Sequence, residues 1–344
     1  YLMYIPNSGN TVIVLNMLDF TTPSLLDTIP VGNNPTSVAV SPDARFAAVA
    51  NKDDGTVSII STFNSTLVGT VNVGSQPSDV SFNKAGTNIY VTNSGDNTLS
   101  TITLNTSNAI HVEALPNKLF LSPDGSKVYI INTGVYNSDT GNSSVSVIDT
   151  KTFQVLATVE VGKKPVDLSL TSDSSKAYVA NKDSGTVSVI EATNNYAVKT
   201  IAMGSGSKPA GIATQGNQAM CTLNATGKLA FIDTTNDTIT TTIDAGNFYP
   251  PKDILPTTIF AHPTNGYAYI LNRYGLQVAA FTVYPKLAVI NTTSQTLEKE
   301  IKLTSDGNTV GEMNWSRDGS LIFIANRNAS SRVTSLTANF ISTS

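Results

Sequence analysis

Few side chains in this sequence combine in a pattern that could perform nucleophilic or acid–base catalysis. Only two histidines, His111 and His262, and one cysteine, Cys221, are present. Nucleophilic catalysis needs a nucleophile, a base within hydrogen-bond reach and a group that orients the base. His111 lies in the strand-like segment IHVEAL and His262 in the turn-like segment AHPTNG, so no Ser-His-Asp grouping and no catalytic residue is predicted. Cys221 lies in a strand-like stretch and is expected to be a buried, inert thiol.

Acidic and amide side chains gather in three turn-like segments, NKDDGT from Asn51, NSGDNT from Asn93 and NKDSGT from Asn181. Calcium takes about six to eight oxygen ligands, and such segments could supply several of them. The same residue types are required by tight strand turns, so no cofactor is predicted and calcium is the weaker alternative. With so few His and Cys residues, no His-rich or Cys-rich metal site is expected, and no metal ligands are predicted.

The composition limits the partners and the location of the protein. Of 344 residues, 13% are charged, and 21 Lys and Arg against 25 Asp and Glu give a net charge of −4. A broad electrostatic footprint for nucleic acid is therefore not expected. No apolar stretch approaches the roughly 18 residues of a membrane-spanning helix, so no membrane span is predicted. Low charge, abundant hydroxyl groups and one cysteine favour an extracellular or cell-surface location, with the periplasm as the alternative.

Eight N-x-S/T sequons are candidate glycosylation sites. They begin at Asn64, Asn105, Asn142, Asn224, Asn236, Asn291, Asn314 and Asn328. A composition this rich in Asn, Ser and Thr also yields sequons by chance.

A repeat with a period of about 40 to 55 residues, typical of propeller blades, runs along the whole chain. AVANKDDGTVSII from Ala48, YVTNSGDNTLSTI from Tyr90 and YVANKDSGTVSVI from Tyr178 are three of its copies. The fourth position of a copy is usually asparagine, and one degenerate copy has Leu223 there. We predict a structural turn role for these asparagines, which are Asn7, Asn51, Asn93, Asn132, Asn181, Asn272 and Asn326.

Each repeat is predicted to contain four short strands. In the second repeat they are Ser37–Ser41, Phe46–Asn51, Thr56–Ser61 and Leu67–Val73, which are rich in β-branched and aromatic residues. Radial stacking of such meanders buries their faces between neighbours. We therefore predict an all-β fold, a single β-propeller domain spanning residues 1–344, with four-stranded antiparallel blades. The strand count, with incomplete units at both ends, favours eight blades over seven.

The segment Tyr90–Asn93 reads YVTN, and other copies add G-T-V-S-V-I after it and S-P-D-G before it. This combined pattern resembles the repeats of YVTN-family β-propellers and covers nearly the whole chain, with Leu223 as a departure. The resemblance implies a propeller fold similar to domains of archaeal and bacterial surface-layer and secreted proteins. Other relatives are periplasmic, and some quinoprotein and cytochrome-associated propellers look related. A motif that builds blades says little about function.

Three long insertions, 133–144, 247–257 and 273–285, interrupt the repeats. The first and third join second to third strands and the second joins one blade to the next. Because strand direction alternates within a blade, all three are expected on one rim. Loops on a rigid scaffold often carry binding, and aromatic side chains are frequent binding anchors. We therefore predict binding residues at Tyr136, Phe248, Tyr249, Lys252, Arg273, Tyr274 and Tyr284.

These features favour a non-enzymatic, secreted or cell-surface β-propeller that acts as an interaction or structural scaffold. A subunit of a surface layer or extracellular filament is the specific form of this hypothesis, with other protein subunits or surface components as partners. Incomplete terminal units leave strand edges that another subunit could pair with. Two alternatives stay open. One is a channel-centred enzyme, lactonase-like or a quinone-dependent oxidoreductase. The other is a periplasmic propeller that binds single-stranded nucleic acid by aromatic stacking, against which the net charge argues.

Overall fold

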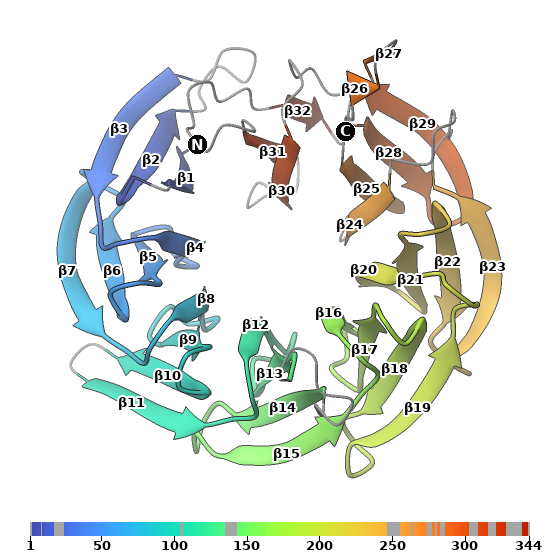
Figure 1. The fold of residues 1–344 in the computed structure, drawn as a ribbon, viewed down its shortest axis with the longest axis horizontal. Helices are drawn as coiled ribbons and strands as arrows, with labels where there is room; N and C mark the ends of the chain where they lie inside the picture. The colour runs from blue at the N-terminus through green and yellow to red at the C-terminus, as the bar shows by residue number, and fades with distance from the viewer. Residues whose placement is uncertain are drawn as a thin grey trace. The chain divides into compact units, whose positions relative to one another are not determined.

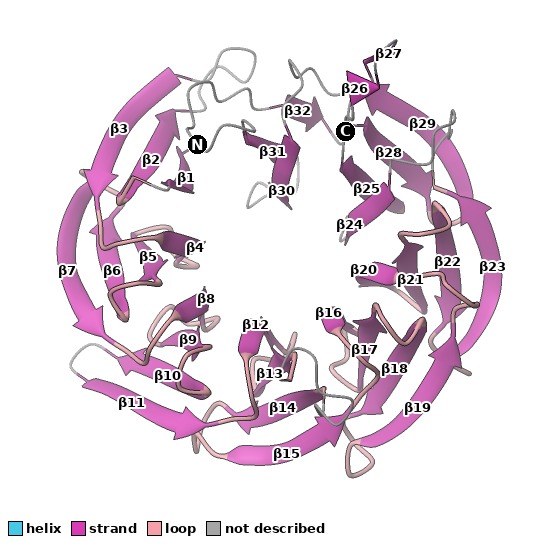
Figure 2. Ribbon diagram, in the orientation of Figure 1, coloured by secondary structure: helices cyan, strands magenta, loops and turns pink. Residues whose placement is uncertain are grey.

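A computed structural model of the chain consists of β-strands joined by turns and loops, with no helix among its described residues (Figure 2). The residues described are 2–7, 9–16, 24–103, 106–134, 143–245, 255–262, 264–273, 277–278, 281–282, 286–302, 309–315, 321–327 and 339–342. Across these ranges, no helix is long and apolar enough to cross a membrane.

The chain divides into two compact units, Tyr1–Glu160 and Val161–Ser344. The first unit begins with a three-stranded antiparallel sheet of β1 (Leu2–Asn7), β2 (Thr11–Asn16) and β3 (Ser24–Pro30). Three four-stranded sheets follow in sequence order. They are β4 (Pro35–Val40), β5 (Phe46–Asn51), β6 (Thr56–Ser61) and β7 (Thr66–Asn72); β8 (Pro77–Phe82), β9 (Ile89–Asn93), β10 (Thr98–Thr103) and β11 (Thr106–His111); and β12 (Pro116–Leu121), β13 (Lys127–Asn132), β14 (Ser144–Asp149) and β15 (Val155–Glu160). Within this unit the first strands β4, β8 and β12 lie side by side (Figure 1).

The second unit also contains three four-stranded sheets. They are β16 (Pro165–Leu170), β17 (Lys176–Asn181), β18 (Thr186–Glu191) and β19 (Ala197–Ala202); β20 (Pro209–Gln215), β21 (Gln218–Leu223), β22 (Lys228–Asp233) and β23 (Thr238–Asp244); and β24 (Leu255–Ala261), β25 (Tyr267–Arg273), β28 (Lys286–Asn291) and β29 (Thr296–Lys302). A short hairpin and a three-stranded sheet complete it. These are β26 (Gln277–Val278) with β27 (Phe281–Thr282), and β30 (Thr309–Trp315), β31 (Leu321–Arg327) and β32 (Asn339–Ser342).

The predicted all-β fold with four-stranded antiparallel sheets is confirmed. Strands β5 and β6 have the predicted bounds, and β4 and β7 differ from the predicted ranges by one or two residues at each end. The third predicted insertion contains the β26–β27 hairpin, which the sequence pattern did not predict. The single domain over residues 1–344 stays a prediction.

Neighbouring sheets bury their faces against each other. In β17, Ala177 to Asn181 are all buried, because both faces of a second strand pack on neighbours. One cluster joins Tyr178 and Val189 of one sheet to Ile212 and Cys221 of the next. This two-sided burial explains why the second and third strands read as continuous apolar runs rather than as alternating patterns.

A buried ion pair also joins two sheets of the second unit. Asp237, in the turn between β22 and β23, lies 2.9 Å from the Nζ atom of Lys176 at the start of β17. The hydroxyl of Tyr178 donates a 2.5 Å hydrogen bond to Asp237. Burial, followed by this hydrogen bond, raises the pKa of Tyr178. The phenol therefore stays protonated and acts as a donor between the sheets.

Backbone hydrogen bonds join two loops at one end of five of the four-stranded sheets. The loop that enters a first strand accepts them from the turn between the second and third strands: Lys52 N–H donates to Asn34 O at 3.0 Å, and Asp53 N–H to Asn33 O at 3.3 Å. The residue before the first-strand proline has a positive φ of about 50 to 55° in five sheets, although none of these residues is glycine. They are Asn34 (52°), Gln76 (52°), Leu115 (55°), Lys164 (55°) and Lys208 (50°). This left-handed backbone turns the chain into the first strand.

Candidate functional site

The acidic turns singled out in the sequence hold loops together. The carboxylate of Asp54 accepts hydrogen bonds of 2.7 Å from both the backbone N–H and the side-chain amide of Asn33. These bonds lower the pKa of Asp54. Asp96 accepts from Ser75 N–H at 2.6 Å in the next sheet. These carboxylates therefore perform the structural role that tight loops require, and calcium binding stays an untested prediction.

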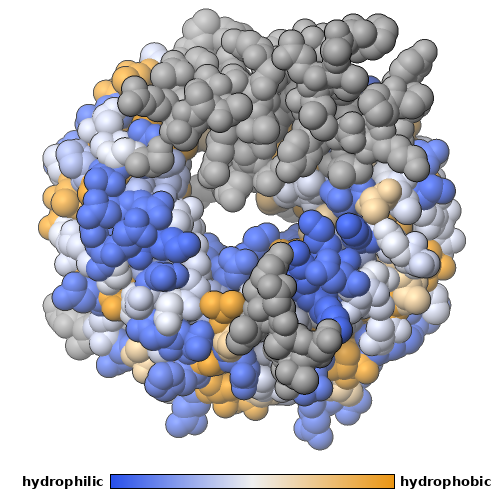
Figure 3. Space-filling model, in the orientation of Figure 1, coloured by the Kyte–Doolittle hydropathy of each residue, from blue (hydrophilic) through white to orange (hydrophobic). Residues whose placement is uncertain are grey.

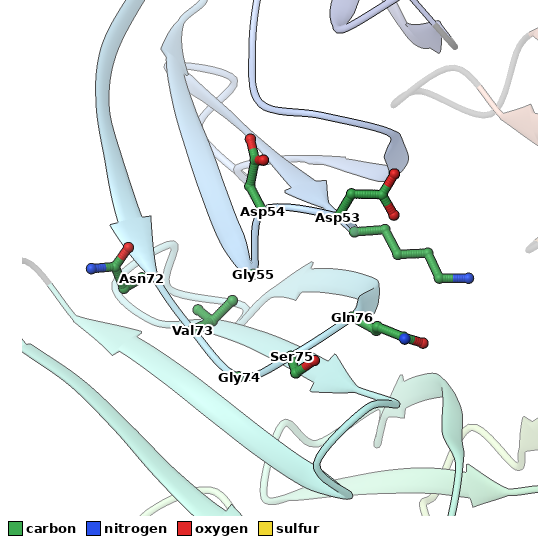
Figure 4. Close-up of a pocket in the computed structure, with 9 residues that line it drawn as sticks. Asp53, Asp54, Gly55, Asn72, Val73, Gly74, Ser75 and Gln76 are labelled. Carbon is green, nitrogen blue, oxygen red and sulfur yellow. The ribbon is translucent and has the colours of Figure 1, made fainter.

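These turns border a shallow hollow of about 510 Å³ in the first unit. Figure 4 shows Asp53, Asp54 and Gly55 on the turn after β5, facing the chain from Asn72 to Gln76 that leads into β8. The Asp54 side chain points away from the Gly74–Gln76 segment, in keeping with its bonds to Asn33. In Figure 3 polar side chains dominate the exposed surface on this part of the unit. The lining of the hollow is mostly polar, with Val73 as its apolar side chain, whereas small-molecule sites are usually lined mainly by apolar groups.

The repeat asparagines end the second strands, and those of the four-stranded sheets are buried. The Nδ2 group of Asn51 donates to Thr56 Oγ1 at 3.0 Å and to Ser58 Oγ at 2.9 Å on the third strand. Asn93, Asn132 and Asn181 repeat this pair of bonds on their own sheets. Asn7 donates to Thr11 at 3.2 Å and Asn272 to Ala245 O at 3.5 Å, whereas the side chain of Asn326 lies outside the described residues.

The two histidines and the cysteine belong to the strands and turns of three different sheets. Nδ1 of His262 accepts 3.1 Å hydrogen bonds from the backbone N–H groups of Thr264 and Asn265, so this ring shapes a turn. His111 is exposed at the end of β11. Cys221 is fully buried in β21, and burial raises the pKa of its thiol. A thiol with a raised pKa and no solvent access is a poor nucleophile.

The first strands bring polar side chains together in a way that the sequence analysis missed. In the six four-stranded sheets the first strand starts at or next to a proline, and a register shift follows, for example between Pro35 and Ser37 and between Pro77 and Asp79. Such β-bulges redirect a side chain and are frequent beside active sites. Here the shift places the second residue after each proline at the seam between neighbouring first strands.

Ser37 and Asp79 meet at one of these seams, between β4 and β8. The Ser37 hydroxyl donates a 2.9 Å hydrogen bond to Asp79 Oδ1, which also accepts the N–H of Val80 at 3.0 Å. Asp79 Oδ2 accepts the N–H of Leu119, on β12, at 3.1 Å. Three neighbouring segments thus hold one carboxylate, and the residue keeps part of its surface exposed. We define Ser37, Asp79 and Lys118 as the first-strand site.

The electrostatics of this site favour a carboxylate that can exchange a proton. Burial raises the pKa of Asp79 above its ordinary value, while the three hydrogen bonds and the positive charge of Lys118 oppose the rise. Lys118 occupies the equivalent position on β12 and is exposed. An acid with a raised pKa beside a cation is the kind of group that accepts a proton during hydrolysis.

The second unit has a related but different arrangement. Asp167 stands at the same repeat position as Asp79, and its Oδ2 accepts the N–H of Ile212 at 3.0 Å. At the next equivalent position is Gly211, where a Cβ atom would lie 2.5 Å from the carbonyl oxygen of Thr257. Asp167 is therefore the matched partner of Asp79 for comparison by mutation, since both accept an N–H from the next first strand.

Most of the predicted binding residues lie outside the described residues. These are Tyr136, Phe248, Tyr249, Lys252, Tyr274 and Tyr284; Arg273 ends β25, and its side chain is outside them too. Within the described part of the chain, no group of three or more His, Cys, Asp or Glu residues could hold a metal ion. One signal in the sequence could have indicated the first-strand site. The tripeptides Pro77–Asp79 and Pro165–Asp167 repeat a carboxylate two residues after a proline.

Comparison with known protein families places the fold. A family model described as "Lactonase, 7-bladed beta-propeller" matches residues 106–339, more than half of the chain. The chain belongs to this family of seven-bladed β-propellers. A second model, the choice-of-anchor I domain, matches residues 1–108 and agrees with an extracellular or periplasmic location. No curated protein sequence matches the chain.

Solved structures with the same fold include several proteins of different activity. One is hydrazine synthase of Kuenenia stuttgartiensis, with a TM-score of 0.60 and 18% identity over 89% of this chain and 93% of that one. Another is the dihydro-heme d1 dehydrogenase NirN, with a TM-score of 0.67 and 16% identity over 94% and 68%. A third is virginiamycin B lyase of Staphylococcus aureus, with a TM-score of 0.62 and 15% identity over 85% and 91%. At these identities the likeness shows the fold alone.

Two predictions from the sequence need correction. The preference for eight blades is not supported, since the family model describes seven. That count relied on the incomplete terminal units, whose described strands form three-stranded sheets. The non-enzymatic scaffold, including its surface-layer and filament form, is wrong because the chain belongs to a lactonase family. The absence of a histidine grouping does not exclude hydrolysis, because a carboxylate can act as the base. The YVTN type of the repeats stays a prediction.

Proposed function

We propose that the protein hydrolyses cyclic esters and that the first-strand site is where this occurs. Membership of the lactonase propeller family supports the reaction class. The observation that carries the site is the seam of Ser37 and Asp79, where three hydrogen-bond donors hold a carboxylate whose burial raises its pKa, on a residue that keeps part of its surface exposed. In β-propellers the first strands line a central channel, where a small substrate has access to such a group.

In this proposal Asp79 is the general base. It takes a proton from a water molecule as the water oxygen forms a bond to the lactone carbonyl carbon. When the ring C–O bond breaks, the proton passes from Asp79 to the leaving alkoxide, which gives the open hydroxy acid. A positioned general base contributes typically about 10²- to 10⁴-fold to the rate.

Lys118 and Ser37 support this step in different ways. The ammonium group of Lys118 is the positive charge that acts on Asp79, and it favours the negative charge that develops on the carbonyl oxygen. Ser37 is a positioning residue, because its hydroxyl donates to Asp79 Oδ1 and fixes the direction of the carboxylate. Loss of Ser37 should therefore impair the rate less than loss of Asp79.

The test is lactone hydrolysis by the purified full chain, followed in a pH-stat with a panel of γ- and δ-lactones. We expect Asp79→Asn to lower kcat/KM by about 100-fold or more. Asp167→Asn, the same change at the matched position of the second unit, should stay within about threefold, well below the rate loss expected of a general base. Failure of the wild-type protein to hydrolyse any lactone would reject the activity. Equal losses in the two variants would reject the site.

We also propose that the protein acts outside the cytoplasm in a secreted or surface-attached form. The match to a choice-of-anchor domain and the low content of charged residues support this location. The dehydrogenase, lyase and synthase among the similar structures do not alter the proposed reaction, because one propeller fold hosts many chemistries.

A further inference from the structure

Four of the eight sequons have described side chains, and their surroundings differ. Asn64 lies in the turn between β6 and β7, and Asn236 lies in the equivalent turn between β22 and β23. Both asparagines are exposed. Asn224 and Asn291 are only partly exposed. Modification of a folded protein requires access to the whole tripeptide. The contacts that each of these four tripeptides makes therefore decide whether it can be modified.

Asn64 has the contacts that permit modification. The hydroxyl of Thr66 donates a 2.9 Å hydrogen bond to Asn64 Oδ1, and among the described residues the Nδ2 group has no hydrogen-bond partner. The middle residue, Ser65, has a φ of 52° and makes no hydrogen bond with its side chain in the described structure. A substituent on Nδ2 would therefore break no hydrogen bond, and of the tripeptide only Thr66, the first residue of β7 and opposite Ser61, belongs to the sheet.

The other three sequons are anchored. Asn236 has the same bond from Thr238, but its middle residue is Asp237, which is buried and paired with Lys176. Asn224 donates its own Nδ2 to the carbonyl oxygen of Pro256 at 3.2 Å.

The sequon at Asn291 is anchored through its middle residue, Thr292. Thr292 is buried, and its single hydroxyl proton has two acceptors in reach, Gln215 Oε1 at 2.5 Å and Gly266 O at 2.7 Å from Oγ1. Lifting this tripeptide from the surface would separate the hydroxyl from both acceptors.

The residue next to Asn64 offers an apolar surface that a sugar could cover. The adjacent Phe63 is 97% exposed, the highest value among the exposed large apolar side chains of the described residues. It borders a hollow of about 640 Å³ that is lined by Ala44, Arg45, Phe46, Ser61, Thr62 and Phe63. A pyranose ring presents an apolar face of C–H groups, and burial of that face against an aromatic ring removes apolar surface of both from water. Asn64 directly follows Phe63 in the chain, so its first sugar would be attached next to a residue that borders this hollow.

We propose that Asn64 is an N-glycosylation site of the folded protein and that its first sugar covers Phe63. The donor class is a polyprenyl-pyrophosphate-linked oligosaccharide. A bond forms between Asn64 Nδ2 and the anomeric carbon of the first sugar as the bond from that carbon to the pyrophosphate breaks. The amide proton passes to a base of the transferase, and the lipid pyrophosphate leaves. In each sheet this turn is at the end opposite to the loops that enter the first strands, so the glycan leaves that end clear.

The experiment treats the purified, folded, non-glycosylated full chain with an oligosaccharyltransferase and this donor, and maps occupancy at each sequon by mass spectrometry. We expect Asn64 to be occupied at least tenfold more than Asn224, Asn236 or Asn291. Thr66→Val, which removes only the hydroxyl, should abolish occupancy at Asn64.

Synthetic peptides that contain each of the four sequons control for the preference of the enzyme. Normalised to its own peptide, Asn64 must exceed the three anchored sites in the folded chain. An unmodified Asn64 with a modified Asn64 peptide would overturn the proposal, as would equal normalised occupancy at Asn64 and Asn236.

Discussion

Replacement of Gly74 by alanine tests how tightly the loops pack on the repeat asparagines. Gly74 lies between β7 and β8, and a Cβ atom there would lie 2.8 Å from Cβ, Cγ and Nδ2 of Asn93. Asn93 is fully buried, and its Nδ2 donates to Thr98 at 3.0 Å and to Ser100 at 2.9 Å. Since real Cβ atoms are not found this close to other atoms, the asparagine must move.

The cost can be estimated from these contacts. Forced overpacking of a dense interior costs about 1–3 kcal/mol. Displacement of Asn93 weakens two hydrogen bonds that are each worth about 0.5–1.5 kcal/mol. We therefore expect Gly74→Ala to lower the free energy of unfolding by about 2–4 kcal/mol, taking partial loss of each contribution. Equilibrium urea denaturation, followed by far-UV circular dichroism, measures this difference.

A control and a double-mutant cycle make the test specific. At Gly69, in β7, an added Cβ atom would have no other atom within 4 Å, so Gly69→Ala should change the free energy of unfolding by less than about 0.5 kcal/mol. In an Asn93→Gly background all three contacting atoms, Cβ included, are gone, and Gly74→Ala should then cost less than about 1 kcal/mol. The reasoning is refuted if Gly74→Ala costs no more than Gly69→Ala, or if its cost is the same in both backgrounds.

Hydrogen bonds to carboxylates and the burial of single side chains can be tested at Tyr178, Asp79 and Cys221. Tyr178→Phe removes a donor to the buried carboxylate of Asp237 and should lower the free energy of unfolding, measured by urea denaturation, by about 1.5–3 kcal/mol. The control is Tyr4→Phe, which removes a buried hydroxyl without a hydrogen-bond partner among the described residues. This change should be neutral or stabilising. The acidic limb of the pH profile of lactone hydrolysis should lie above the ordinary aspartate pKa of about 3.9, because the base must be deprotonated and burial raises the pKa of Asp79. Asp79→Asn should remove that limb. An unchanged limb in this variant would contradict the assignment of Asp79 as the base. Cys221 should react with a thiol reagent at least 100-fold faster in urea than in the native protein, because burial raises its pKa and blocks access; similar rates in the two states would show that the thiol is accessible.

The sequence predicts the strands well because their signals are local. The pattern that gives β5 and β6 depends on β-branched residues and on turn residues a few positions away, such as Asn51 and Gly55. The role of the repeat asparagines also follows from their place at the end of a strand. The first-strand site could not be predicted in this way. Ser37 and Asp79 are 42 residues apart, and they meet only because a register shift after each proline turns them toward the same seam.

The functional prediction failed for a related reason. Polar residues in short strands read as surface when each strand is considered alone, so the only mark on Asp79 and Asp167 in the sequence is the proline two residues before each. Only the pairing of neighbouring first strands shows that backbone N–H groups of Leu119 and Ile212 point at them. Conversely, the more conspicuous acids in the turns, such as Asp54, are occupied by loop contacts.

The left-handed residues that precede the first-strand prolines have a consequence for how this surface can vary. Their backbone is fixed by the proline and by hydrogen bonds from the adjacent turn, so little of the fold depends on which side chain they carry. The five sheets place amide, aliphatic and cationic groups there, from Asn34 and Gln76 to Leu115 and Lys208. Each of these sheets thus has one position at which the side chain can vary while the backbone conformation stays the same. Substitutions at these positions, except by β-branched residues that resist a positive φ, can change the chemistry of the surface while the scaffold stays the same.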